Sequence, residues 1–458
     1  MKIRKAFLLA TSLSVLATCL VSQSLAENGP LLDANGVPCR GGVLDRAHQC
    51  MSSSATTATP DHPYRDVEGL KGMPIRQNYD ELFLPDGRAN SKGRSGFTRG
   101  GRELILVAVP GSIVVLDAND HYKFVKRIVF QDLPASILPE LVSDMMASPA
   151  TNMVYVSTRG HIFALDLITE KVVWQNTYEP GTCCERGQVT PDGLTLEVGS
   201  DLKDFHRVLD ARTGKVKGII QTPMSMFNHN MGMSADGKTV FDAPNGITMT
   251  VADLATMKAI KTITFDDHIR VFVLNHDASR VYANLNNLLG FEIADVKSGK
   301  VIKRIEVPGE MWKAKWANPN LHFFGHGAPM HGIALTPDES EIWIPDAVNN
   351  QVLVYDNSGE WPVLEPGKTI KTEYPNGWIT MGLDGQRAYM ASGDVVDVKS
   401  HQIVGILRDE YGRYMDSEKM LDMEFDRSGH LVRTVNAFAE GDPKAYAART
   451  AVRSKGNK

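Results

Sequence analysis

The sequence predicts an all-β fold, a seven-bladed β-propeller with four-stranded antiparallel blades. Apolar runs that end in an aspartate recur along the chain, and five of the six intervals between these aspartates are 41 to 49 residues long. Turn sequences such as TPDGL and SADGK precede the runs, and an alternating strand follows each turn. A period of this length holds about four short strands, and so small a sheet buries its faces only by stacking on neighbours around an axis.

Each repeat is marked by its closing aspartate. The seven anchors are Asp117, Asp166, Asp210, Asp253, Asp295, Asp356 and Asp397. The clearest repeat is HGIALTPDESEIWIPDAVNNQVLVYD, residues 331–356. A further turn and strand, DRSGHLVRTV at 426–435, has no anchor, so we expect this C-terminal segment to complete the first blade and close the ring. Eight blades are the alternative.

The first 26 residues predict a cleavable signal peptide and hence a periplasmic or secreted protein. Three basic residues precede an apolar run from Ala6 to Leu20, and Ser24-Leu25-Ala26 is a small-x-small cleavage site. No other apolar run approaches the roughly 18 residues that a membrane span requires. We expect residues 27–98 to be an N-terminal extension and linker, 99–440 the propeller, and 441–458 a loose, polar C-terminal tail.

The net charge of the chain limits the kinds of partner that it is expected to bind. The formal charge is −5, and removing the three basic residues of the signal makes it −8. An acidic exported protein is a poor candidate for nucleic-acid binding, which depends on basic surfaces. We therefore expect a monomer that binds a small molecule, with a protein of the cell envelope as an alternative partner.

The cysteines suit an oxidising compartment. Cys19 leaves with the signal, and Cys39 and Cys50 bracket a loop that a disulfide could close. Cys183 and Cys184 are adjacent, either as a vicinal disulfide or as two thiols. No CxxCH sequence occurs, so covalent c-type haem is excluded.

The repeats at 190–198 (TPDGLTLEV), 234–241 (SADGKTVF) and 331–356 give the chain a likeness to known propellers. It resembles the YVTN-type seven-bladed propellers, the group that includes lactonase-like and quinohaemoprotein-amine-dehydrogenase-like proteins. The resemblance covers roughly residues 100–435, although MVYVST, EIWIPD and RAYMAS stand where that group often reads YVTN. It implies the fold and not an activity, because this fold carries many unrelated functions.

Propeller geometry predicts where a site lies. The strand before each Pro-Asp turn should line the axial channel, with its first residues at the mouth. Counting back six residues from each turn's proline position gives Ser143, Glu185, His229, Arg270, His331, Gly377 and Leu421. Counting back five gives Asp144, Arg186, Asn230, Val271, Gly332, Trp378 and Asp422. Lys419 and Glu418 approach the same mouth from the last blade.

These residue types suggest a ligand or metal site. His229, His331, Glu185 and His326 are the predicted ligands of a divalent metal of unknown identity. His229, His331 and Arg270 are the candidate catalytic residues, with histidine moving a proton and arginine stabilising an oxyanion. Candidate ligand-binding residues are Arg186, Asn230, Trp378, Cys183, Cys184, Trp312 and Trp316. The alternative is that these polar groups only bind channel water.

A long insertion lies beside the predicted mouth. The interval from Asp295 to Asp356 exceeds the others by about 18 residues, and the excess, MWKAKWANPNLHFFGHGAPM, is aromatic. Aromatic loops at a mouth are commonly lids or binding walls, although their rings can simply pack on blade edges.

Three functions are compatible with these features. The favoured one is an exported propeller that binds a small, anionic organic ligand at the axial mouth, with a metal-assisted lyase or hydrolase activity if it is an enzyme. A non-catalytic interaction platform in the envelope is the second. The third is a redox accessory propeller: Trp174 echoes the docking motif of quinoprotein dehydrogenases, and Met226, Met231 and Met233 flank His229 as possible copper ligands. We expect six of the remaining histidines to be solvated, namely His48, His62, His121, His206, His401 and His430.

Overall fold

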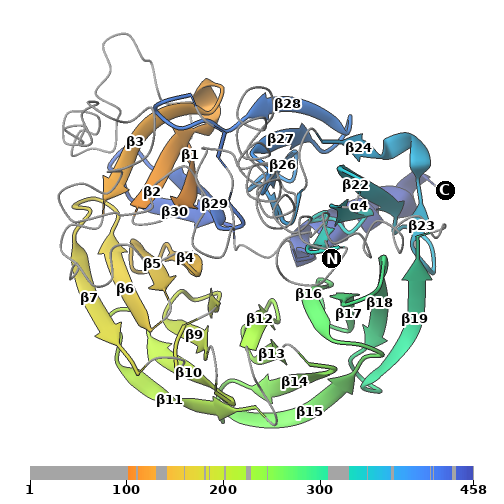
Figure 1. Ribbon diagram of the computed structural model, residues 1–458, viewed down its shortest axis with the longest axis horizontal. Coiled ribbons are helices and arrows are strands. Elements are labelled where there is room, and N and C mark those ends of the chain that lie inside the picture. The colour runs from red at the N-terminus through yellow and green to blue at the C-terminus, as the bar shows by residue number, and fades with distance from the viewer. Residues whose placement is uncertain are drawn as a thin grey trace, which may run out of the picture.

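The fold is an all-β ring of small antiparallel sheets. The computed structural model describes residues 102–109, 112–129, 142–158, 160–179, 182–184, 186–200, 203–222, 228–244, 246–307, 330–347, 349–372, 376–412, 414–415, 417–435 and 440–456. Their strands stand around a common centre, with the first strand of a sheet nearest the centre and the last at the rim (Figure 1). The all-β propeller that the sequence predicts is confirmed.

Within each group the strands pair antiparallel, and except for the first group the chain completes one group before it begins the next. The first two groups are β1 (Arg102–Val109), β2 (Ser112–Asp117) and β3 (Lys123–Val129), then β4 (Asp144–Ser148), β5 (Met153–Thr158), β6 (His161–Asp166) and β7 (Val172–Thr177). Next come β8 (Gly187–Val189), β9 (Thr195–Gly199), β10 (Phe205–Asp210) and β11 (Val216–Gln221), then β12 (Asn228–Met233), β13 (Thr239–Pro244), β14 (Thr248–Asp253) and β15 (Lys258–Thr264). Short turns rich in Gly, Asp and Asn make these local pairings possible.

The second half of the chain repeats this arrangement. Its groups are β16 (Ile269–Leu274), β17 (Arg280–Leu285), β18 (Gly290–Asp295) and β19 (Lys300–Glu306), then β20 (Ala334–Leu335), β21 (Glu341–Asp346), β22 (Gln351–Asp356), β23 (Val363–Leu364) and β24 (Ile370–Lys371), then β25 (Ile379–Met381), β26 (Arg387–Met390), β27 (Asp394–Asp397) and β28 (Gln402–Ile406). Two 3₁₀ turns, η1 (Ala118–Asp120) and η2 (Pro366–Lys368), follow β2 and β23.

The two ends of the described chain meet in one sheet. β29 (Met420–Phe425) pairs antiparallel with β1, with Arg102 opposite Phe425, and β30 (Leu431–Thr434) lies on its other edge. The predicted closure by a C-terminal strand is therefore correct, and it covers edges that would otherwise be exposed. By hydrogen bonding the described strands form six sheets, because a single parallel pair, Thr264 with Lys300, joins two four-stranded groups into one sheet. The blade number of seven stays a prediction.

Every anchor aspartate ends a strand. The seven strands that end on them are β2, β6, β10, β14, β18, β22 and β27. Each carboxylate then accepts a backbone N–H from the turn that follows, as Asp210 does from Arg212 at 3.1 Å and Thr213 at 3.0 Å. The anchors recur because the turn leading to the outermost strand needs an acceptor at this position.

The core lies between neighbouring sheets. β16 is buried along its whole length, whereas β19 in the same group alternates between exposed and partly buried residues. Apolar clusters cross from one sheet to the next: Phe241 and Met249 of one group pack with Phe272 and Val281 of the following one. Each sheet is thus stabilised by stacking on its neighbours.

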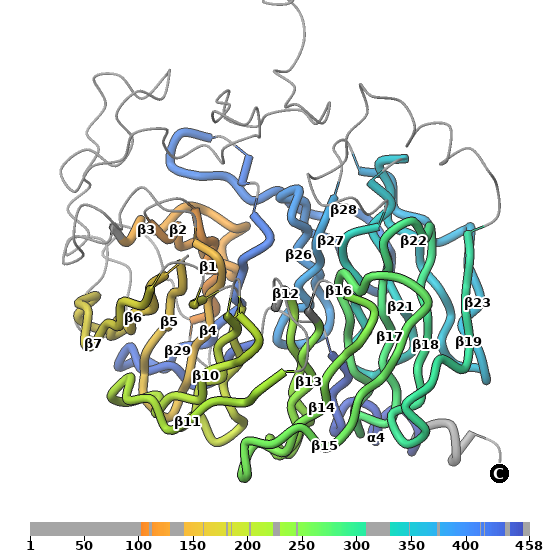
Figure 2. The backbone as a smooth tube through the Cα atoms, turned by 60° about the horizontal axis from the view of Figure 1, so that its bottom comes forward, coloured from red at the N-terminus to blue at the C-terminus, as the bar shows by residue number. Residues whose placement is uncertain are grey.

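The C-terminal tail is helical, which corrects the prediction that it is loose. Helix α4 (Pro443–Gly456) lies beside the sheets in both views (Figure 2). Gly441 N–H donates to the Leu274 carbonyl, and the Tyr446 ring stacks on His276 with the ring centroids 3.7 Å apart. Within the described part of the chain, no helix combines the length and the apolar character that crossing a membrane requires.

Candidate functional site

Six side chains associated with five sheets meet near the starts of strands β4, β8, β20, β25 and β29. We call them the axial cluster: Asp144, Arg186, His331, Trp378, Glu418 and Lys419. Asp144 opens β4, and the others immediately precede β8, β20, β25 and β29 or lie a few residues before them. The convergence that repeat phase predicts therefore occurs for these residues.

Glu418 is the centre of the axial cluster. Its carboxylate lies 3.0 Å from Lys419 Nζ, 3.3 Å from His331 Nδ1 and 3.4 Å from Arg186 Nη2. Arg186 also faces Asp144, with Nη1 3.6 Å from Oδ1, and its guanidinium carbon lies 4.4 Å from the centre of the Trp378 ring. Three nitrogen-bearing side chains thus surround one carboxylate, beside an indole face.

The environment shifts the protonation of this cluster. Although burial alone would raise it, the pKa of Glu418 is held well below its usual range by Lys419, His331 and Arg186. Burial, followed by the like charge of Arg186, lowers the pKa of Lys419, while Glu418 opposes that change. Burial raises the pKa of Asp144 against the attraction of Arg186. Glu418 therefore stays ionised, and Lys419 gives up its proton more readily than an ordinary lysine.

Access differs within the axial cluster. Asp144, Arg186 and His331 are almost fully buried, while the side chains of Glu418 and Lys419 are 20% and 16% exposed. Arg186 lies 3.4 Å from its nearer carboxylate, longer than the 2.7–2.9 Å typical of a tight charge-assisted hydrogen bond. Among the nitrogen-bearing side chains of the axial cluster, Lys419 is the most exposed.

Other predicted mouth residues lie outside this set. The described contacts of Arg270 are with Asn286, whose Oδ1 accepts from Nε at 2.5 Å, and with Asn230, whose amide donates to the Arg270 carbonyl. Burial lowers the pKa of Arg270. No contact given by the described residues joins Arg270 or Asn230 to the axial cluster, so their predicted roles stay predictions.

The sulfur atoms of the adjacent Cys183 and Cys184 lie within bonding distance across a cis peptide bond, and the vicinal disulfide stays a prediction. Both are buried in an apolar cluster that includes Tyr155 and Leu196, between the β4–β7 and β8–β11 groups. Cys183 and Cys184 precede Arg186 by only a few residues, so they lie next to the axial cluster along the chain. Their part in ligand binding stays a prediction.

Several predicted residues are not covered. Glu185, Trp312, Trp316 and His326 lie outside the described residues, as do Cys39 and Cys50. His229 lies in β12, but its side chain is not among those described. The predicted metal site at the mouth therefore has one described ligand, His331.

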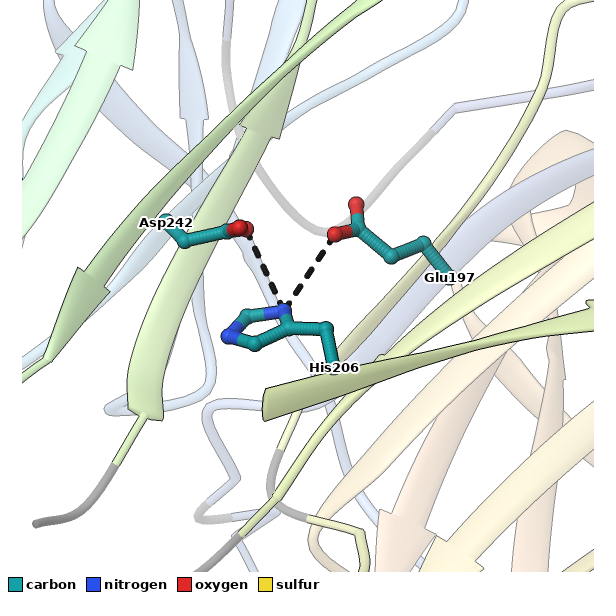
Figure 3. A group of neighbouring side chains, drawn as sticks. All are labelled: Glu197, His206 and Asp242. Atoms are coloured by element: carbon teal, nitrogen blue, oxygen red, sulfur yellow. Dashed lines mark ion pairs between the residues drawn. The ribbon is translucent and has the colours of Figure 1, made fainter. Parts of the chain in front are cut away.

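A second cluster of ionisable groups lies between two sheets. Glu197 on β9, His206 on β10 and Asp242 on β13 point toward one another (Figure 3). His206 Nδ1 lies 3.3 Å from Glu197 Oε1 and 3.2 Å from Asp242 Oδ1. All three residues are 0% exposed. One imidazole and two carboxylates are a donor set that could hold a divalent metal ion.

Burial dominates the protonation of this triad. It raises the pKa of Glu197 to about 8 and, together with the charge of Glu197, raises that of Asp242 well above its ordinary value. The prediction that His206 is solvated is wrong, because β10 faces a neighbouring sheet. His401 is also only 11% exposed and pairs with Glu341 at 2.9 Å.

The triad was not predicted from the sequence, although a signal exists. Glu197 in TLEV and Asp242 in VFDA are acids with apolar residues on either side. The hydrophobic alternation predicts that the strands containing them are buried. A buried acid in such a position is expected either to pair with another polar group or to be protonated. The sequence does not show that the two acids face each other.

Trp174 docks one sheet on the next. Its indole Nε1 donates to the Ala211 carbonyl at 3.1 Å. The ring also covers Gly214, which adopts a left-handed backbone (φ +68°) and at which a Cβ would lie 2.4 Å from the ring. This contact between sheets explains why Trp174 occupies the position of the tryptophan in the quinoprotein docking motif, and the contact itself involves no quinone.

Comparison with known proteins supports the fold alone. No family model matches the chain, and no curated protein matches it. Among solved structures the chain is similar to the hydrazine synthase of Kuenenia stuttgartiensis, with a TM-score of 0.50 and 14% sequence identity over 69% of this chain and 97% of that one. At this identity the likeness carries the architecture and no activity. Fold and site together define the class of the protein as a β-propeller with a charged axial cluster.

Proposed function

We propose that this chain is an exported seven-bladed propeller of YVTN-like type that binds a small organic anion at its axial mouth. The observation that carries the proposal is the convergence of Arg186, Lys419 and His331 on the single carboxylate of Glu418. A ligand carboxylate would compete with Glu418 for these donors, and guanidinium and ammonium groups are the usual partners of such anions. Trp378 adds an apolar wall.

A lyase or hydrolase activity is the second candidate. Lys419, with its lowered pKa, stands beside the ionised Glu418 at the accessible edge of the axial cluster. A lysine whose pKa is lowered gives up its proton more readily and can act as a general base, while Arg186 stabilises an enolate or oxyanion. The divalent metal predicted on His229, His331, Glu185 and His326 would assist this chemistry.

The export part of the proposal rests on the signal-like residues 1–26. A vicinal disulfide is also in keeping with an oxidising compartment. N-terminal sequencing of protein recovered from the periplasm or medium tests it: a start at Glu27 is expected, and an uncleaved Met1 would contradict it.

Calorimetric titration tests ligand binding. The purified mature protein is titrated with succinate, citrate and the neutral analogue succinamide, and the anions should bind while succinamide does not. Lys419→Met should weaken anion binding about tenfold or more, since a charged hydrogen bond contributes about 1.5–3 kcal/mol. Lys419→Arg, which keeps the charge, should retain most of the affinity.

The same set of variants provides a control for the binding measurement and a test of the alternative function, the interaction platform. Arg212→Met removes an exposed cation away from the axial cluster and should leave binding unchanged. Equal binding of succinamide and succinate, or equal affinity in Lys419→Met, would exclude an anion site. If deleting residues 312–325 abolishes capture of an envelope protein while Lys419→Met has no effect on any ligand, the interaction platform is the correct function.

A further inference from the structure

The Glu197–His206–Asp242 triad joins two separate sheets. Glu197 and His206 lie on adjacent strands, β9 and β10, whose pairing places them on the same face. Asp242 comes from β13 of the next group, and its carboxylate meets the same imidazole nitrogen (Figure 3). A Gln188 amide to Met231 carbonyl hydrogen bond at 3.3 Å connects the same two groups nearby. The triad therefore occupies a closed position between two stacked sheets.

Within the described part of the chain, the polar atoms of the triad have no hydrogen bonds to residues other than the triad itself. Both oxygens of each carboxylate and both nitrogens of the imidazole are buried without an outside donor or acceptor. Two buried carboxylates without a cation are costly, because burial removes the water that would stabilise their charge. The arrangement is satisfied either by protons on the carboxyl groups or by a positive charge at its centre.

We propose that Glu197, His206 and Asp242 bind a divalent transition-metal ion of the Zn²⁺ class. Imidazole nitrogen with carboxylate oxygen is a normal zinc donor set. Donor atoms 3.2 and 3.3 Å apart, each at the usual distance of about 2.1 Å from a zinc ion, subtend roughly 100° at the metal, close to the tetrahedral angle. A divalent ion neutralises both carboxylates.

Thr250 offers a further oxygen at this position. It is the direct cross-strand partner of Asp242, so both side chains lie on one face of the sheet. Its Oγ1 is buried, and no described residue forms a hydrogen bond with it. Thr250 can therefore orient the Asp242 carboxylate or complete the coordination, as outer partners do at metal sites.

The site is structural in character and goes beyond the proposed ligand function. All three ligands are 0% exposed, and a closed site without access for substrate is typical of structural zinc. The metal would fasten two adjacent sheets at a point where apolar stacking is interrupted by charge. Its loss should weaken the ring without altering the axial cluster.

Metal analysis of the purified mature protein tests the proposal. The protein is incubated with Zn²⁺, dialysed against a weak chelator and measured by inductively coupled plasma mass spectrometry. We expect about one equivalent in the wild type and less than a tenth of that in His206→Ala. The matched control His401→Ala removes a histidine that pairs with Glu341, outside both the triad and the axial cluster, and should keep the full equivalent.

Co²⁺ provides a second readout that does not depend on stability. Wild-type protein loaded with Co²⁺ should show visible d–d absorption, and the near-isosteric Glu197→Gln, checked for folding by circular dichroism, should lose or shift it. Absence of bound Zn²⁺ and Co²⁺ in the folded wild type, or full retention in folded His206→Ala and Glu197→Gln, overturns the proposal and leaves a proton-sharing cluster. Loss of metal in His331→Ala alone would place the metal at the mouth instead.

Discussion

The axial cluster and the Glu197–His206–Asp242 triad both hold carboxylates away from water, but they differ in how charge is neutralised. In the axial cluster two acids, Asp144 and Glu418, are matched by Arg186 and Lys419 and by the imidazole of His331. In the triad two acids share one imidazole, with no lysine or arginine among their described contacts. The first cluster is complete with protein groups, while the second lacks a cation.

The difference also concerns access. Lys419 and Glu418 are partly exposed, so the axial cluster can exchange one of its own ion pairs for a ligand. The triad is sealed between sheets and can exchange nothing without opening the stack. A balanced, accessible cluster is suited to reversible binding, whereas an unbalanced, sealed one is suited to a permanently bound ion.

Breaking the charge balance at the axis should have the largest effect. Arg186→Met leaves Asp144 and Glu418 without the guanidinium between them, and removing one partner of a buried ion pair costs about 3–5 kcal/mol. The free energy of unfolding from urea denaturation should fall by that amount. The surface variant Arg212→Met should stay within about 0.5 kcal/mol of wild type. A loss below about 1 kcal/mol in Arg186→Met would mean that the axial cluster is not charge-coupled.

Supplying the missing cation should stabilise the triad. Zn²⁺ at about one hundred times its dissociation constant should raise the free energy of unfolding by about 2.7 kcal/mol, and EDTA should reverse the gain. His206→Ala should remove this response, whereas Lys419→Met should keep it. The same Zn²⁺ response in both variants would show that the ion binds elsewhere.

A smaller effect is expected from pH. The folded pKa of Glu418 lies well below its ordinary 4.5, so its stabilising contribution is complete above the unfolded value and is lost as the pH falls through the folded one. The difference in unfolding free energy between wild type and Glu418→Gln should therefore shrink on going from about pH 6 to about pH 3. A difference that is constant or grows in acid would show that Glu418 is not held ionised by its neighbours.

The partly exposed anchor aspartates should matter least. Asp210→Ala removes an acceptor for two backbone N–H groups and the Thr213 hydroxyl at a solvated turn, which should cost about 1 kcal/mol. Asp210→Asn keeps one side-chain oxygen and should recover part of the loss in a thermal melt. A cost equal to that of Arg186→Met would remove the contrast between solvated and buried acids.

Several elements were predictable because they depend on local sequence. The turn motifs and anchor aspartates fixed the strand ends, so the strands ending at Asp117 through Asp397 lie where the repeat predicted. Repeat phase, with a shift of one residue, also predicted that Arg186 and Trp378, five residues before their turns, and His331, six before its turn, come together. The helix at 443–456 was not predicted, because its apolar periodicity is weak and its docking through Tyr446 on His276 is a tertiary contact.

By itself, the sequence determined the class of fold, the closing strand and the set of residues that could reach the axis. Only the tertiary structure decided that His206 is buried and that Glu197 and Asp242 face it from adjacent sheets. The physical reason is that alternation within a strand tells which side chains share a face, but not which face of the next sheet will lie against them. That choice is made by how the sheets stack, and the charge of a site depends on it.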